Sequence, residues 1–179
     1  MEYTSISLQK GVWRMDLIQI VAHALEFIFP AYCANAIPVL AGGGPAMDFG
    51  KKLPDGRPVF GKNKTFRGFF AGLAVGTVAG LAESFVFKYP VMFGLLLSLG
   101  ALFGDLTGAF VKRRLAIPPG ELLPVVDQLD FIIGALLFSL PLSMSWSWEL
   151  LITILVITPP IHLLTNFAAY KLKLKSNPW

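Results

Sequence analysis

The chain has 179 residues, of which 55% are hydrophobic and 15% are charged, and its mean hydropathy is +0.65. Soluble domains carry about 25% charged residues, so this composition excludes an ordinary soluble protein and predicts a single-domain integral membrane protein covering residues 1–179. The net charge is +4. The cations flank apolar runs, which indicates a membrane surface and anionic small molecules, and not nucleic acid.

The first predicted membrane span covers residues 15–39, which is long enough to cross a hydrocarbon core of about 30 Å. Pro30 and Pro38 interrupt it, and it carries His23 and Glu26 three positions apart. These two side chains could pair inside a helix bundle. Either they form a satisfied structural pair, or they line a pathway for protons or a substrate.

A polar loop follows over residues 41–66, and its length and its glycines, prolines and cations are typical of functional loops. Residues 56–63, GRPVFGKN, nearly match the phosphate-binding P-loop pattern. Asn63 stands where that pattern needs Ser or Thr, and a membrane span precedes it instead of a strand, which excludes a P-loop fold. The cations Lys62, Lys64 and Arg67 remain suited to phosphates, although a cytoplasmic loop would carry such charge in any case.

The second and third predicted spans cover residues 67–87 and 90–111. Glycine recurs at every fourth position in both, at Gly68, Gly72, Gly76 and Gly80 and at Gly100, Gly104 and Gly108. Such stripes allow helices to approach closely, so we expect the two helices to pack on each other and, in addition, to flank a groove for lipid. Asp105 lies beside the second stripe, where a carboxylate needs a cation or water.

The stretch GDLTGAFVKRRLAIPPGELLPVVDQLDFIIG, residues 104–134, concentrates charge at an apolar boundary. On a helix, Asp105 and Lys112 share a face two turns apart. Asp127 and Asp130 are three positions apart, so they also share a face. Three carboxylates beside a basic triplet are suited to holding a divalent metal and a polyphosphate. The simpler alternative is that Asp127 caps the next helix and Asp130 lies in its first turn.

The fourth predicted span covers residues 128–143 and the fifth covers residues 148–170, with Pro159 and Pro160 inside it. His162 near the end of the fifth span is expected to be packed or interfacial. The lysines of the tail, including Lys175, are expected to anchor the chain at the membrane surface.

The distribution of cations predicts the orientation of about five membrane-spanning helices. One side carries Lys10, Arg14 and Lys88, whereas the other carries Lys51, Lys52, Arg57, Lys62, Lys64, Arg67, Lys112, Arg113, Arg114, Lys171, Lys173 and Lys175. The excess of positive charge on cytoplasmic segments places the N-terminus outside and the C-terminus in the cytoplasm. The loops 41–66 and 112–127 are then both cytoplasmic.

The motif GDLTGAFVKRRLAIPPGELLPVVDQLD resembles the C-terminal motif of the CDP-diacylglycerol synthase superfamily, in which a basic pair, a Pro/Gly loop and D-x-x-D follow one another. The loop GRPVFGKNKTFRG and the small size are similar to the archaeal branch, the CDP-archaeol synthases. The chain departs from the bacterial pattern, because DQLD lacks the Arg after the first Asp and residues 121–126 replace a His-Gly-Gly element.

The resemblance implies an all-α membrane enzyme in the cell membrane that uses CTP and Mg²⁺. Its reaction would transfer a cytidylyl group to the phosphate of unsaturated archaetidic acid, the bis-geranylgeranyl ether of glycerol phosphate, with release of pyrophosphate. Asp105, Asp127 and Asp130 would then hold the metal, with Lys112 and Arg113 also in the catalytic set. Residues expected to contact the nucleotide are Lys62, Asn63, Lys64, Thr65, Arg67 and Gly68.

A small ion or metabolite transporter is the alternative, with Asp105, Glu26 and His23 along its path. The strongest charge cluster lies at one surface and not along a crossing route, which favours the enzyme. A CDP-alcohol phosphotransferase is excluded because its denser aspartate motif is missing. The oligomeric state stays open.

Overall fold

The computed structural model describes residues 16–142, 144 and 146–178. Within these ranges the chain forms five α-helices: α1 (Leu17–Ala41), α2 (Phe66–Phe87), α3 (Phe93–Arg114), α4 (Val126–Ser139) and α5 (Trp148–Lys171), with a short 3₁₀ helix, η1 (Leu140–Leu142), after α4. The only extended pairing in the described ranges is at two isolated bridges in the first loop. The all-helical prediction is therefore confirmed, whereas Lys10 and Arg14 lie outside the described residues.

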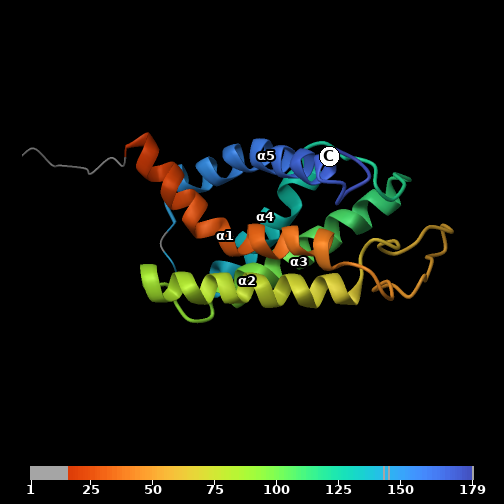
Figure 1. The fold of residues 1–179 in the computed structure, drawn as a ribbon, viewed down its shortest axis with the longest axis horizontal. Coiled ribbons are helices and arrows are strands. Elements are labelled where there is room, and N and C mark those ends of the chain that lie inside the picture. The colour runs from red at the N-terminus through yellow and green to blue at the C-terminus, as the bar shows by residue number, and fades with distance from the viewer. Residues whose placement is uncertain (1–15, 143, 145, 179) are drawn as a thin grey trace, which may run out of the picture.

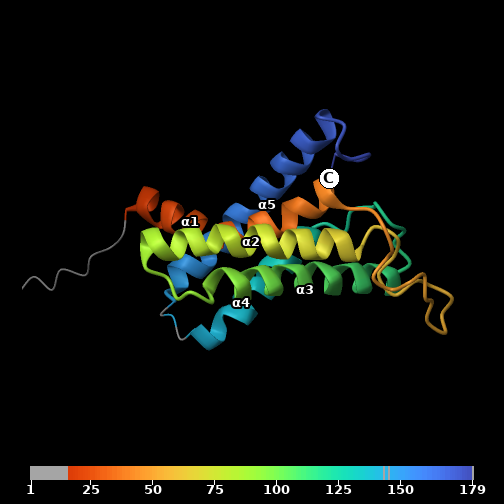
Figure 2. The ribbon, with the colours of Figure 1, turned by 60° about the horizontal axis from the view of Figure 1, so that its bottom comes forward.

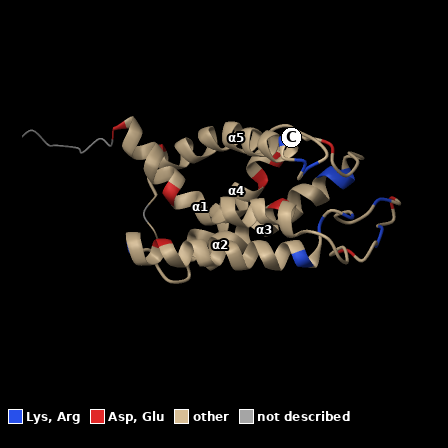
Figure 3. Cartoon of the chain, viewed as in Figure 1, with Lys and Arg blue, Asp and Glu red and all other residues tan. Residues whose placement is uncertain are grey.

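Successive helices α1, α2 and α3 run in alternating directions, so the two polar loops lie together (Figure 1), and the second half of α5 diverges from them (Figure 2). The loop between α1 and α2, the loop between α3 and α4, and the C-terminal end of α5 all lie at one end of the bundle, which we call the loop end (Figure 2). The start of α1, the α2–α3 connection and the start of α5 lie at the other end, the far end. Lys and Arg gather at the loop end (Figure 3).

Four described helices, α1, α2, α3 and α5, are long and apolar enough to cross a membrane. The remaining helix, α4, is shorter: its 14 residues extend about 21 Å at 1.5 Å per residue. That is less than a hydrocarbon core of about 30 Å. The count of five spans and the outside position of the N-terminus therefore stay predictions.

One correction concerns the basic triplet. Lys112, Arg113 and Arg114 were expected at the start of a loop over residues 112–127, but they form the last turn of α3. Cations there are favoured by the negative end of the helix dipole. The helical backbone also points Lys112 and Arg113 into the protein, where both are buried.

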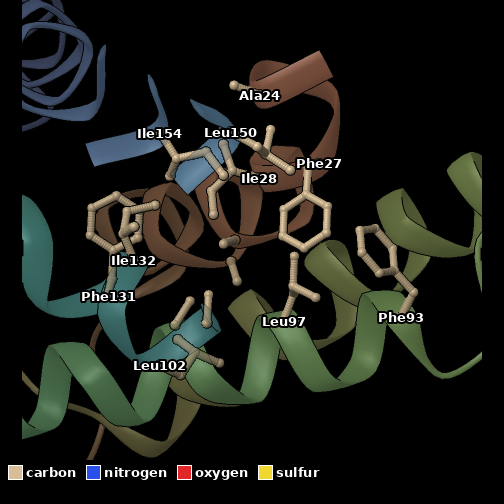
Figure 4. Packing of buried hydrophobic residues seen from close by; sticks show 14 residues of the cluster. Ala24, Phe27, Ile28, Phe93, Leu97, Leu102, Phe131, Ile132, Leu150 and Ile154 are labelled. Atoms are coloured by element: carbon tan, nitrogen blue, oxygen red, sulfur yellow. The ribbon is translucent and has the colours of Figure 1, made fainter. Parts of the chain in front are cut away.

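The core of the bundle lies around α1, which packs against all four other α-helices. Figure 4 shows its large side chains meeting those of α3, α4 and α5; fully buried members are Phe27, Ile28, Phe93, Leu97, Phe131, Ile132 and Ile154. In a bilayer, lipid is as apolar as these side chains, so helix association depends on close van der Waals packing.

Glycines provide that packing, but the two stripes face different partners. On α2, a Cβ at Gly72 would lie 2.5 Å from the Ala34 carbonyl oxygen of α1, and one at Gly80 would lie 2.1 Å from Gly94 of α3. On α3, Gly100 and Gly104 instead face the backbone of α4. The expected packing is therefore present, and the stripes are filled by neighbouring helices, whereas the groove for lipid stays a prediction.

Candidate functional site

A cavity of about 580 Å³ lies at the loop end. Its walls come from the ends of α1, α3 and α5, the start of α4, both polar loops and the C-terminal tail. Pockets of about 300–1,000 Å³ are typical for small-molecule ligands. Segments far apart in the sequence therefore build one site.

The first loop is shaped by Asp48. Its buried carboxylate accepts hydrogen bonds from the backbone N–H groups of Gly50 at 2.9 Å, Phe60 at 2.9 Å and Gly61 at 2.8 Å. Burial raises the pKa of Asp48, but these N–H donors outweigh it and leave the pKa below its ordinary value of 3.8. The fold of the loop around this carboxylate brings residues 62–65 to the cavity.

The tip of the same loop is tied to the end of α3. Arg114 pairs with Asp55 at 2.6 Å and donates to the Pro58 carbonyl, while Arg57 donates to the carbonyl of Arg114. The N–H of Arg57 and the charge of Arg114 lower the pKa of Asp55. Of the basic triplet, Arg114 therefore ties the first loop to the end of α3, whereas Lys112 and Arg113 line the cavity.

The structure brings most of the predicted nucleotide contacts to the cavity. Lys62, Asn63, Lys64 and Thr65 line it, but Arg67 and Gly68 do not. Thr65 is the N-cap of α2 and accepts the N–H of Gly68 at 3.2 Å. Arg67 and Gly68 already belong to the first turn of α2, so their place is set by the helix.

Two lysine–aspartate pairs span the cavity walls. Lys64 donates to both oxygens of Asp105 at 2.6 Å, and Lys112 donates to Asp127 at 2.6 Å. All four side chains are partly buried, with exposed fractions of 28% and 25% in the first pair and 11% and 18% in the second. The charge of Asp105 within α3 is therefore balanced by a cation, as expected, but that cation is Lys64 of the first loop and not Lys112.

Asp127 is held by more than its lysine. Its carboxylate also accepts the N–H of Leu123 at 2.9 Å. The N-cap of α4 is Val125, at φ 68°, and no side chain caps this helix. The alternative that Asp127 caps the fourth helix is therefore wrong, because the chain turns at Val125 before the helix begins and Asp127 lies in the first turn.

Asp130 lines the cavity next to the third helix. A Cβ at Gly108 would lie only 1.9 Å from its Oδ2, so the small size of that glycine makes room for the carboxylate. Its Oδ1 accepts the N–H of Phe131 at 2.6 Å. The charge of Asp105 acts on it from across the site, and Lys64 opposes that repulsion.

Arg113 is the most deeply buried cation of the site, with an exposed fraction of 5%. Two of its nitrogens, Nε and Nη1, have no hydrogen-bond partner among the described residues. A buried guanidinium is costly unless its donors are satisfied. Its place in the cavity wall suits it to an anionic ligand.

The three aspartates fit a divalent metal by chemistry but are not gathered around one point. Carboxylate oxygens are the ligands that Mg²⁺ prefers, and all three line one cavity. In the described part of the chain, however, no three His, Cys, Asp or Glu side chains lie close enough to hold a metal ion. Two of the three carboxylates instead form ion pairs with lysines, Asp105 with Lys64 and Asp127 with Lys112.

Several cavity residues were missed or misjudged from the sequence. His162 and Asn166 of α5 line the cavity with their side chains 3.2 Å apart, and Asn35 of α1 belongs to the same wall. The sequence signal that could have identified this wall is the pair His162 and Asn166, two polar residues one turn apart in an apolar helix. Lys175 and Asn177 of the tail also line the cavity, although Lys175 was expected only to anchor the chain.

A second polar cluster lies toward the far end. The Tyr89 hydroxyl donates to Glu26 at 2.7 Å, so Glu26 pairs with this tyrosine and not with His23. Glu83 of α2 has an exposed fraction of 8%, and its Oε2 lacks a hydrogen-bond partner among the described residues.

Comparison with known proteins gives a consistent result. A family model described as CarS-like, CDP-archaeol synthase, matches residues 17–179. CDP-archaeol synthases of Pyrococcus furiosus and Methanopyrus kandleri are 47% and 43% identical to the chain, covering 89% and 97% of it and 98% and 95% of their own lengths. A solved structure described as an intramembrane enzyme for archaeal membrane lipid biosynthesis aligns with a TM-score of 0.75 and 39% identity, over 82% of this chain and 94% of that one.

Proposed function

The chain belongs to the CDP-archaeol synthase family, and from that membership we propose that its reaction takes place in the loop-end cavity. The enzyme transfers a cytidylyl group from CTP to the phosphate of unsaturated archaetidic acid and releases pyrophosphate. The transporter alternative is not supported, because full-length relatives at this identity are synthases.

One observation carries the assignment of the site: four cations and three aspartates from the first loop, α3 and α4 line a single cavity. Lys62, Lys64, Lys112 and Arg113 offer charge to phosphates, and Asp105, Asp127 and Asp130 offer hard oxygen ligands. Asn63 and Thr65 contact the nucleotide from the first loop. Arg67 and Gly68 act by starting α2 and not by touching the nucleotide.

The chemistry suits a site that lacks a strong base. The nucleophile is an oxygen of the lipid phosphate monoester, whose second pKa is about 6, so it is largely ionised near pH 7. This oxygen bonds to the α-phosphorus of CTP while the bond from that phosphorus to the β-phosphate oxygen breaks, and pyrophosphate leaves. The main barrier is the repulsion of two anions, which Lys64, Lys112 and Arg113 reduce.

The lysines and aspartates exchange partners when substrate binds. In the structure, Lys64 pairs with Asp105 and Lys112 pairs with Asp127. Triphosphate oxygens would attract both lysines, and Asp105, Asp127 and Asp130 are the residues that would then hold Mg²⁺. A bound Mg²⁺ would supply neutralisation of charge on the transferring phosphate.

The site faces the cytoplasm. CTP is a cytoplasmic metabolite, and the excess of Lys and Arg at the loop end agrees with the positive-inside rule. Single cysteines at Lys52 and Leu172, each in a Cys33→Ala background, should react with an impermeant thiol reagent only after cells are opened. Labelling of either position in intact cells would reverse the proposed orientation.

The test of the site uses purified protein, CTP labelled at its α-phosphate, unsaturated archaetidic acid and Mg²⁺. Labelled CDP-lipid and one equivalent of pyrophosphate should appear, and EDTA should stop the reaction until Mg²⁺ is restored. Product that persists in EDTA would exclude the metal. A Lys64→Met variant with wild-type turnover would exclude the proposed exchange of partners.

A further inference from the structure

The C-terminal tail turns back toward the cavity where α5 ends. The N–H of Lys173 donates to the carbonyl of Tyr170 at 2.9 Å, and the N–H of Leu174 donates to the carbonyl of Ala169 at 2.9 Å. Lys173 has φ 60°. This is a Schellman motif, which ends a helix and reverses the chain. Residues 174–177 thereby become part of the cavity wall.

A second contact fixes the tail in this place. The side-chain amide of Asn177 donates to the carbonyl of Gly120 at 2.8 Å. Gly120 belongs to the loop between α3 and α4, and its φ of 95° is one that glycine adopts readily. The tail is therefore attached both to the end of α5 and to the second loop, and Gly120 and Asn177 both line the cavity.

This path brings Lys175 among the charges of the site. Lys64 and Lys112 act on it as like charges, and Asp105 and Asp127 as opposite ones. Burial, and after it the charge of Lys64, lower the pKa of Lys175. Asp105 and Asp127 each form an ion pair with another lysine at 2.6 Å. Lys175 therefore adds a third lysine to the part of the cavity wall that holds these two pairs. An anionic ligand in the cavity would be attracted by all three lysines.

We propose that Lys175 binds a phosphate group of a substrate in the loop-end cavity, and that Asn177 positions it there through Gly120. This inference rests on the proposed site. It makes the C-terminal tail part of the substrate-binding surface and not only a membrane anchor. The phosphate belongs either to CTP or to the lipid, and the two sources give different results in the experiment.

The experiment compares Lys175→Met with Lys175→Arg, which keeps the charge, and with Lys173→Met, which removes an exposed lysine outside the loop-end cavity. CTP binding is measured by calorimetry without lipid, and the KM for archaetidic acid is measured by turnover. Loss of a charge-assisted contact should raise one of these constants about tenfold or more in Lys175→Met. Lys175→Arg should recover most of the loss, and Lys173→Met should match the wild type.

A higher Kd for CTP assigns the contact to the nucleotide, whereas a higher lipid KM with unchanged CTP binding assigns it to the lipid phosphate. If Lys175→Met leaves both constants within about twofold of wild type, well short of a charge-assisted contact, the inference is wrong. Equal melting temperatures of the free proteins would show that the variants are folded. A wild type that binds CTP but makes no CDP-lipid would count against the proposed function, while the CTP-binding comparison would still test Lys175.

Asn177 needs a separate measurement because it acts through another residue. Asn177→Ala should weaken the same constant as Lys175→Met, by a smaller factor. If Asn177 only positions Lys175, the double variant should be no worse than Lys175→Met alone. Additive losses would assign Asn177 a role independent of Lys175 and overturn this part of the inference.

Discussion

The two polar clusters of the bundle differ in their cations. At the loop end, Asp105 and Asp127 each contact a lysine at 2.6 Å and line a cavity. Toward the far end, Glu26 bonds to Tyr89, and neither it nor Glu83 has a salt bridge among the described residues. The difference teaches that an acidic residue alone does not distinguish the two ends of the bundle, whereas cations and a cavity beside it do.

The largest effect is expected from Asp127→Asn, which removes the charge at the loop end and keeps the shape. Loss of a carboxylate that holds the proposed metal should reduce turnover by roughly 10²-fold. The matched control is Asp55→Asn, because Asp55 has an equally short ion pair, at 2.6 Å to Arg114, but lies outside the cavity. CDP-lipid formation with excess Mg²⁺ measures both, and near wild-type turnover in Asp127→Asn would remove this residue from the catalytic set.

An intermediate effect is expected from Asp48→Asn, which tests whether the loop end depends on its supporting carboxylate. Asparagine offers one acceptor oxygen where Asp48 has two that together accept three N–H groups. The first loop should loosen, and the Kd for CTP should rise several-fold while the helices stay folded. Unchanged CTP binding would mean that the loop keeps its shape without this carboxylate.

The same variant has a distinct dependence on pH. The pKa of Asp48 in the folded protein lies below 3.8, so the folded state binds its proton less readily than the unfolded state. The stability that Asp48 contributes is therefore complete well above pH 3.8 and is lost as pH falls through the folded pKa. Melting temperatures between about pH 6 and about pH 3 should fall more steeply in wild type than in Asp48→Asn, and parallel curves would contradict this assignment.

The smallest effect is expected from Glu83→Gln at the far end. Because this carboxylate has no salt bridge among the described residues, the amide removes a charge without leaving a described lysine or arginine unpaired. Turnover and CTP binding should stay within about twofold of wild type, since residues at opposite ends of the bundle that share no partners couple weakly. A loss comparable to that in Asp127→Asn would show that the far end takes part in the reaction.

The sequence predicted the helices well, because long apolar runs bounded by charge leave few alternatives in a bilayer. The fifth span was expected over residues 148–170, and α5 covers Trp148–Lys171. It also predicted that Asp105, Asp127, Lys64 and Lys112 would lie at one surface, since their types and positions at helix ends point there, and all four line one cavity. The metal itself stays a prediction.

The partners within the site were harder to predict, because they depend on loops. Asp105 was placed beside Lys112 by helical spacing, but the first loop brings Lys64 to it. The tight turn at Val125 has no sequence signal, since its φ of 68° is one that glycine adopts more readily than valine, and the helix starts there, before Asp127. The return of the tail also depends on a residue with positive φ, Lys173.

The shortness of α4 has a consequence for how the two substrates meet. Its first turn carries Asp127 and lines the same cavity as Asp105, which lies about 13 Å along α3 from its last residue, Arg114, at 1.5 Å per residue. In the proposed site the phosphates of the nucleotide would therefore lie within the length of α3, and the isoprenoid chains would stay in their leaflet. The encounter would then reduce to lateral diffusion of the lipid, in two dimensions, toward the cavity.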